Sequence, residues 1–160
     1  MPDGRLYDTD WYAWTQEQAS ALRRMAETRV NSELDLENLA EEVESLGRSE
    51  ENALDSALTR VIEHLLKLEH SPAPEPRKKW RLSVIEHRNR AQKSIRKSGS
   101  LRRLLPDLLP DAWKDGRTLA ASALELFDSI PLDTVPTKCP YTLDQILDDG
   151  FYPANRHGLD

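Results

Sequence analysis

The sequence has little cysteine and no long apolar run. Its 160 residues include one cysteine, Cys139, which cannot form a disulfide within the chain. The longest apolar run is only a few residues, far short of the roughly 20 that a membrane-spanning helix needs. The N-terminus also lacks the basic-then-apolar order of a signal peptide. These absences predict a cytoplasmic protein that does not interact with membranes.

Motifs for catalysis are missing as well. The sequence contains no glycine-rich phosphate loop, no paired cysteines and no G-x-S-x-G nucleophile motif. Cys139 lies between Lys138 and Pro140 without an acid-base pair nearby in the sequence, so we do not expect it to be a nucleophile. An enzyme is therefore less favoured than a binding protein, and we expect no cofactor.

Composition predicts one globular unit of helices. The mass of 18.3 kDa, with 38% hydrophobic and 31% charged residues, is typical of one domain over residues 1–160 with flexible ends at 1–5 and 154–160. No stretch alternates with the period of a strand, whereas spacings of three and four dominate. We expect an all-α bundle of about five to six helices with extended N- and C-terminal arms. The expected helices are 16–29, 35–46, 49–70, 78–97, 111–127 and a short one at 142–147.

Three of these boundaries depend on individual residues. A capping box formed by Thr15 and Gln18 predicts the start of the first helix. The apolar stripe of 35–46 changes phase at Gly47, so we expect a break or kink at 47–49; that stripe is Leu36, Leu39, Val43 and Leu46. Pro106 and Pro110 predict a short turn before the helix 111–127, whose inward face includes Leu119, Ala123 and Phe127.

The charges are segregated along the chain. The net charge is −6, yet residues 77–103 contain eleven Lys or Arg and one acid, Glu86. Residues 33–55 contain nine carboxylates and one cation, Arg48. The basic segment therefore either pairs with the acidic one inside the fold, which we favour, or binds a polyanion such as nucleic acid. For nucleic acid, Trp80 could stack on a base while nearby cations hold phosphates, although its alignment with Val84 favours a core position. The cations are Arg77, Lys78, Lys79, Arg81 and Arg88.

A second candidate site combines carboxylates with a histidine. Glu41 and Glu44 could share a cation with His64, near Lys67, in the manner of metal sites inside helical bundles. A helical wheel, however, directs Glu41 away from the apolar stripe. We therefore expect no metal site here, with His64 hydrogen-bonded to a neighbouring side chain or carbonyl and Lys67 solvated.

An ordered set of motifs resembles one bacterial family, catalogued as domain of unknown function 29. The resemblance covers about residues 6–153 and implies a small all-helical protein, without an established activity. The matching residues are Tyr7-Asp8-Thr9-Asp10-Trp11, Trp14-Thr15, Asn38-Leu39-Ala40-Glu41-Glu42-Val43-Glu44-Ser45-Leu46-Gly47, His64-Leu65-Leu66-Lys67, Trp80, Arg88, Ser100-Leu101, Cys139-Pro140-Tyr141, Phe151 and Pro153.

The sequence as a whole favours a binding or adaptor module with a protein partner. Nucleic acid and a second copy of the chain remain open as partners. The alternative functions are a nucleic-acid-binding protein that uses residues 77–103, and a metal-dependent hydrolase that uses Glu41, Glu44 and His64.

Overall fold

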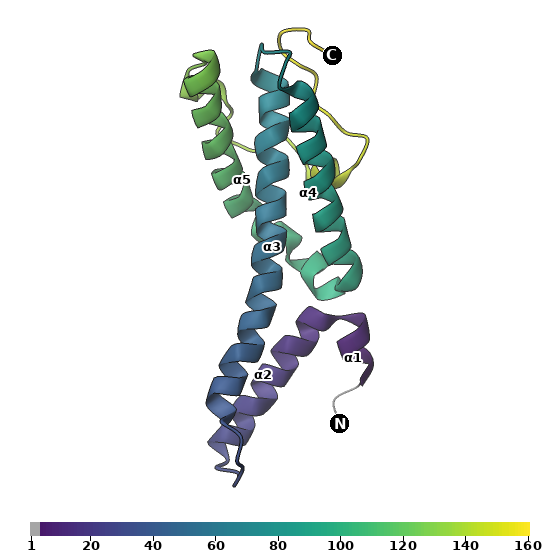
Figure 1. Ribbon diagram of the computed structural model, residues 1–160, viewed down its shortest axis with the longest axis vertical. Helices are drawn as coiled ribbons and strands as arrows, with labels where there is room; N and C mark the ends of the chain where they lie inside the picture. The colour runs from purple at the N-terminus through teal and green to yellow at the C-terminus, as the bar shows by residue number, and fades with distance from the viewer. Residues whose placement is uncertain (1–3) are drawn as a thin grey trace. The chain divides into compact units, whose positions relative to one another are not determined.

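The computed structural model describes residues 4–160 and confirms the all-α class (Figure 1). Within this range the regular structure is helical throughout, and no helix has the length and apolarity needed to cross a membrane. The helices are α1 (Gly4–Thr9), α2 (Trp11–Glu27), α3 (Leu36–His70), α4 (Arg77–Lys97), α5 (Gly99–Asp128), a 3₁₀ turn (Leu132–Thr134) and α6 (Leu143–Leu147).

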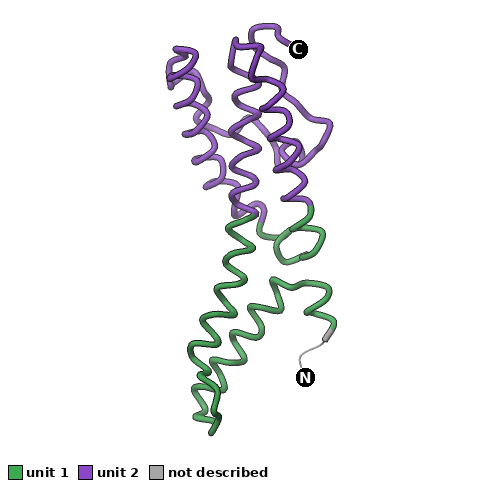
Figure 2. The backbone as a smooth tube through the Cα atoms, viewed as in Figure 1, with its two compact units in different colours: residues 1–53, 93–104 green, residues 54–92, 105–160 purple. Residues whose placement is uncertain are grey.

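The chain forms two compact units, each assembled from two separate stretches of sequence (Figure 2). Unit 1 consists of residues 1–53 and 93–104, and unit 2 of residues 54–92 and 105–160. The three long helices α3, α4 and α5 therefore contribute residues to both units.

The N-terminal arm is helical, so the predictions of an extended arm and of a cap at Thr15 were wrong. Asp10 is the N-cap of α2, where its carboxylate accepts a hydrogen bond from the Ala13 amide. Thr15 is buried inside α2, and its hydroxyl donates to the Tyr12 carbonyl. Asp10 is as good an N-cap as threonine and comes five residues earlier in the chain. Because α2 starts directly after Asp10, Trp11, Tyr12 and Trp14 lie on this helix.

The Asp10 carboxylate also closes the start of α5. It accepts hydrogen bonds from the Ser100 amide at 2.9 Å, the Ser100 hydroxyl at 2.6 Å and the Ser98 hydroxyl at 2.5 Å. The Ser98 hydroxyl in turn accepts from the Leu101 amide. Burial would raise the pKa of Asp10, but the hydrogen bonds from Ser100 and Ser98 outweigh it and lower the pKa. One carboxylate thus caps α2 and the start of α5, both within unit 1.

Helix α3 runs through Gly47 without interruption, so the predicted break was wrong. Leu39 and Leu46 are 38% and 50% exposed, whereas Ala40 is fully buried and Gly47 is buried. A Cβ atom on Gly47 would lie 2.5 Å from the Thr15 hydroxyl oxygen. The glycine therefore permits the close approach of α2 and does not end the helix.

Helix α5 likewise continues through Pro106 and Pro110, against the predicted interruption. Each proline removes one backbone donor, which leaves the carbonyls of Arg102 and Pro106 without their helical partners. Both prolines are exposed, so water can reach this side of the helix. Burial of Ala112 on the opposite side keeps the segment against the core of unit 2.

The C-terminal tail is mostly non-helical, as predicted, and the capping box of Thr142 and Gln145 at the start of α6 is confirmed. The side-chain amide of Asn155 donates to the carbonyls of Leu68 and Ser71, and the backbone amide of Arg156 donates to the Glu69 carbonyl. Leu68 and Glu69 lie in the last turn of α3, whose carbonyls lack helical donors, and Ser71 directly follows the helix. Residues 154–160, predicted as a flexible end, are thus hydrogen-bonded to α3.

Candidate functional site

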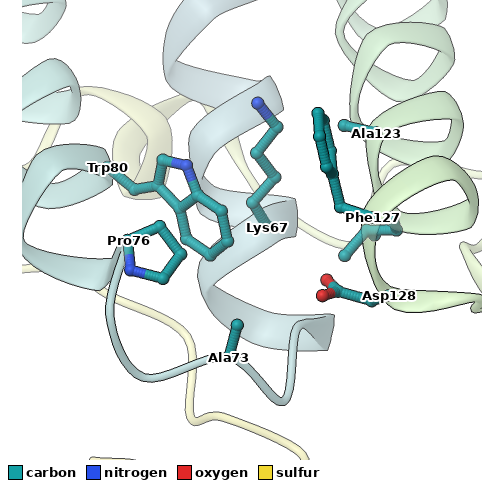
Figure 3. Close-up of a pocket in the computed structure, with 8 residues that line it drawn as sticks. Lys67, Ala73, Pro76, Trp80, Ala123, Phe127 and Asp128 are labelled. Carbon is teal, nitrogen blue, oxygen red and sulfur yellow. The ribbon is translucent and has the colours of Figure 1, made fainter.

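A groove of about 420 Å³ lies in unit 2, where α3, α4 and α5 meet (Figure 3). The Lys67 side chain forms its floor, and the Trp80 and Phe127 rings stand on opposite sides (Figure 3). The remaining lining residues are Ala73, Pro76, Ala123, Leu124 and Asp128. Six of the eight lining side chains are apolar, so the groove suits an apolar group.

The short connection between α3 and α4 places Trp80 beside Lys67. Helix α3 ends at His70, and α4 begins at Arg77 directly after Pro76, whose fixed φ suits the start of a helix. Trp80 lies on the first turn of α4, and its amide donates to the Pro76 carbonyl. The Lys67 Nζ atom is 5.8 Å from the centroid of the Trp80 ring. Trp80 is half-buried and is part of the groove wall.

Lys67 is not solvated as predicted, because it pairs with a carboxylate one turn earlier. Its Nζ atom donates to Glu63 Oε2 at 2.7 Å, and its side chain is only 15% exposed. Arg60 donates to the other oxygen of Glu63, also at 2.7 Å. Burial would raise the pKa of Glu63, but these two cations outweigh it and lower the pKa. The floor of the groove therefore consists of the lysine methylenes, with the charge compensated by Glu63.

The outer wall of the groove is unusually exposed. Phe127 is 80% exposed and the adjacent Leu126 is 77% exposed, whereas the sequence pattern placed Phe127 on the inward face of its helix. That face is instead formed by small residues and Leu124, which is 1% exposed. Ala120 was expected on this face, but the sequence signal that was overlooked is that Ala112 and Ala121 accompany it, so that a row of small residues brings the helix close to the core. The leucine and phenylalanine consequently remain outside.

Asp128 gives the groove a polar end. Its carboxylate accepts a hydrogen bond from the Ser71 hydroxyl at 2.7 Å, which links the end of α5 to the end of α3. Asp128 and Lys67 are the only charged groups among the residues that line the groove.

The candidate site of Glu41, Glu44 and His64 is not assembled. Glu41 accepts from Arg48 at 3.0 Å, and Glu44 accepts from Arg23, so both carboxylates are engaged within unit 1. His64 Nδ1 lies 2.7 Å from the Arg60 carbonyl, which confirms the expected hydrogen bond, and burial lowers the pKa of His64. Within residues 4–160 no three Asp, Glu, His or Cys side chains are grouped to hold a metal ion.

Of the six candidate nucleic-acid contacts, the structure buries two arginines. Arg88 is fully buried and donates to the carbonyls of three tail residues, Gln145, Ile146 and Phe151. Arg77 is buried too, and it donates to Leu68 and to Asp160. Neither arginine side chain is therefore accessible to a phosphate, although both were candidates for that contact. The exposed members of the set are Lys78, Lys79 and Arg81, with Trp80 half-buried in the groove.

The ion pairs of these side chains also test the predicted pairing of the acidic segment 33–55 with the basic segment 77–103. Arg77 pairs with the C-terminal Asp160, while Glu41 and Glu44 pair with Arg23 and Arg48. For these side chains the ion pairs do not join segment 33–55 to segment 77–103.

Comparison with known proteins gives one family and one solved structure. The family model described as "Domain of unknown function DUF29" matches residues 6–152. An alpha-helical protein of unknown function from Rhodospirillum rubrum has a similar crystal structure, with 27% sequence identity and a TM-score of 0.73. The similarity covers 91% of this chain and 90% of that chain. Among curated proteins, none matches this sequence.

Proposed function

Because the chain belongs to the family described as Domain of unknown function DUF29, whose description assigns no activity, we propose a function from the groove of unit 2. The protein is a binding module that takes a large apolar side chain of a partner protein between Trp80 and Phe127.

The exposure of Phe127 is the observation that supports this proposal. A phenylalanine side chain gains about 1.5 to 3 kcal/mol when it moves from water to an apolar environment. Phe127 forgoes most of this gain, since it is 80% exposed on the wall of a groove. Large exposed apolar groups beside a concavity are typical of interaction sites, and buried aromatic anchors dominate the energy of many interfaces.

The charges of the groove favour an apolar anchor over a charged one. The Lys67 ammonium is already paired with Glu63, and the Asp128 carboxylate accepts from Ser71. A charged anchor would have to displace one of these partners and lose its own hydration. An apolar side chain requires neither, because it contacts the rings and the lysine methylenes. The two charged groups can then fix the orientation of the partner backbone.

Selection of peptides from a displayed library on the full chain tests the proposal. We expect the selected peptides to share one large apolar residue. Their affinity should fall about 10-fold or more in Phe127→Ser, since the anchor loses the burial of the phenylalanine ring. The matched control is Leu82→Ser. Leu82 is an exposed apolar residue on α4, 56% exposed, and it does not line the groove. This control should leave the affinity unchanged.

Two results would contradict the proposal. One is a set of selected peptides without an apolar anchor, and the other is an equal loss of affinity in Phe127→Ser and Leu82→Ser. If no peptide is selected, sedimentation of the wild-type chain shows whether the partner is a second copy, because Phe127→Ser should then abolish self-association.

A further inference from the structure

Unit 1 contains a second cavity, of about 390 Å³, whose wall is aromatic. Three of its lining residues carry aromatic rings, Tyr7, Trp11 and Tyr12. The other lining residues are Asp8, Glu50, Ser94, Lys97, Ser98 and Leu101. The cavity thus joins α1 and α2 to the end of α4 and the start of α5.

The aromatic wall is held in place by contacts inside unit 1. The Asp10 carboxylate ties the α1–α2 corner to Ser98 and Ser100. Tyr7 contacts the Trp14 ring edge-on, with centroids 4.8 Å apart, and yet remains 53% exposed. The Tyr12 hydroxyl donates to Glu51, and burial together with this carboxylate raises the pKa of Tyr12 to about 12. These rings form a preorganised and partly open stacking surface.

The residues that line this cavity include one cation, Lys97, and two carboxylates, Asp8 and Glu50. Lys93 and Lys97 are both exposed and lie one turn apart on α4, on the same side of the helix. Further exposed cations in the same unit are Arg96, Arg102 and Arg103. None of the five forms an ion pair with another residue of 4–160, and residues 87–106 contain no acid. Their charge is therefore available to an anionic ligand.

We propose that this cavity binds single-stranded nucleic acid. A base stacks on the rings of Tyr7 and Trp11, and the adjoining phosphates lie against Lys93 and Lys97. Aromatic stacking surfaces bordered by cations are the general means of binding single strands, because every base has a π-face and every linkage has a charge. This site goes beyond the proposed groove function and uses the other unit. Its cations come from the end of the basic segment 77–103, away from the candidate set around Trp80.

Fluorescence anisotropy of a labelled oligothymidylate of about 12 nucleotides, titrated with the full chain, measures the binding. The double variant Lys93→Gln/Lys97→Gln should weaken binding and reduce the slope of log affinity against log salt by about 1.4, since each phosphate contact contributes about 0.7. The matched control is Lys78→Gln/Lys79→Gln, which removes the same charge from exposed positions at the other end of α4. We expect this control to leave the slope unchanged.

Three further variants test the stacking and the sign of the ligand charge. Tyr7→Leu should weaken binding about 5- to 100-fold without altering the salt slope, and Tyr7→Phe should retain wild-type affinity. Asp8→Asn removes a carboxylate from the cavity wall and should strengthen the binding of an anion. A cationic ligand among the aromatic rings would instead bind more weakly to Asp8→Asn.

Four outcomes with oligonucleotides would overturn the inference. They are absence of binding at about 25 mM salt, equal effects of the two lysine doubles, equal affinity for a duplex of the same length, and wild-type affinity in Tyr7→Leu. Binding of a trimethylammonium probe that Asp8→Asn weakens would also overturn it, in favour of a cation site. None of these outcomes affects the groove proposal, because Phe127 is in unit 2.

Discussion

Replacing Gly116 by alanine should lower the stability of unit 2, even though alanine is the better helix former. Gly116 is buried on α5, where it faces α3. A Cβ atom at this position would lie 2.9 Å from the Ile62 Cγ2 atom and 2.9 Å from the Thr59 carbonyl oxygen. The carbonyl belongs to a helix backbone, so it cannot rotate away as a side chain can.

The two opposing effects can be compared in size. Alanine in place of glycine inside a helix gains about 1 kcal/mol. Relief of the overlap requires α5 to move by about half an ångström, and overpacking of this kind costs about 1 to 3 kcal/mol. The expected result is a net loss of about 1 kcal/mol in the free energy of unfolding. For a chain of this size that loss lowers Tm by about 2 to 4 °C.

Urea and thermal unfolding, followed by far-ultraviolet circular dichroism, provide the measurement. Gly99→Ala is the matched control on the same helix, because a Cβ there would be 3.7 Å from the nearest atom, in the Arg103 side chain. The control should stabilise by about 0.4 to 1 kcal/mol through a less flexible unfolded chain. A Gly116→Ala protein as stable as Gly99→Ala would refute the close approach of α5 to Thr59.

Three other substitutions test contacts elsewhere. Gly47→Ala should destabilise by about 1 to 3 kcal/mol, and Thr15→Ala should relieve most of that loss in a double-mutant cycle, because the added methyl meets the Thr15 hydroxyl. Glu63→Gln should cost about 1 to 3 kcal/mol at neutral pH. Because the folded pKa of Glu63 is lowered, this difference in unfolding free energy should shrink as pH falls below the ordinary value of 4.5. Arg88→Lys should lower the free energy of unfolding by about 2 to 4 kcal/mol, since an ammonium cannot reproduce the planar set of bonds to three carbonyls; urea unfolding that matches wild type would contradict this.

The helix boundaries that the sequence predicted well are those marked by strong local signals. Helix α4 was expected at 78–97 and spans Arg77–Lys97, because prolines precede it and Ser98-Gly99 follows it. The α6 capping box was also correct. The start of α2 was misplaced because Asp10 and Thr15 are both good caps, and only the bonds of Asp10 to distant serines decide between them.

Hydrophobicity misidentified two packed positions in the first part of α3 and indicated neither cavity. Ranking residues by hydrophobicity selected Leu39 and Leu46, whereas the packed positions are Ala40 and Gly47, where neighbouring helices need small residues. The groove depends on residues of three helices, and its wall includes Phe127 because α5 packs through alanines. Such features depend on which helices become neighbours, and a single sequence does not specify this.

The bonds of Asp10 also constrain the order in which the protein can fold during synthesis. Its serine partners follow 88 and 90 residues later in the chain, so α2 can form its own cap early but unit 1 cannot be closed until residue 100 has emerged. Unit 2 likewise needs both its stretches, 54–92 and 105–160. Contacts of such large sequence separation slow folding, since the loop must close before the bonds form. No single cut in the chain releases either unit with all of its residues, so truncation is a poor route to isolating them.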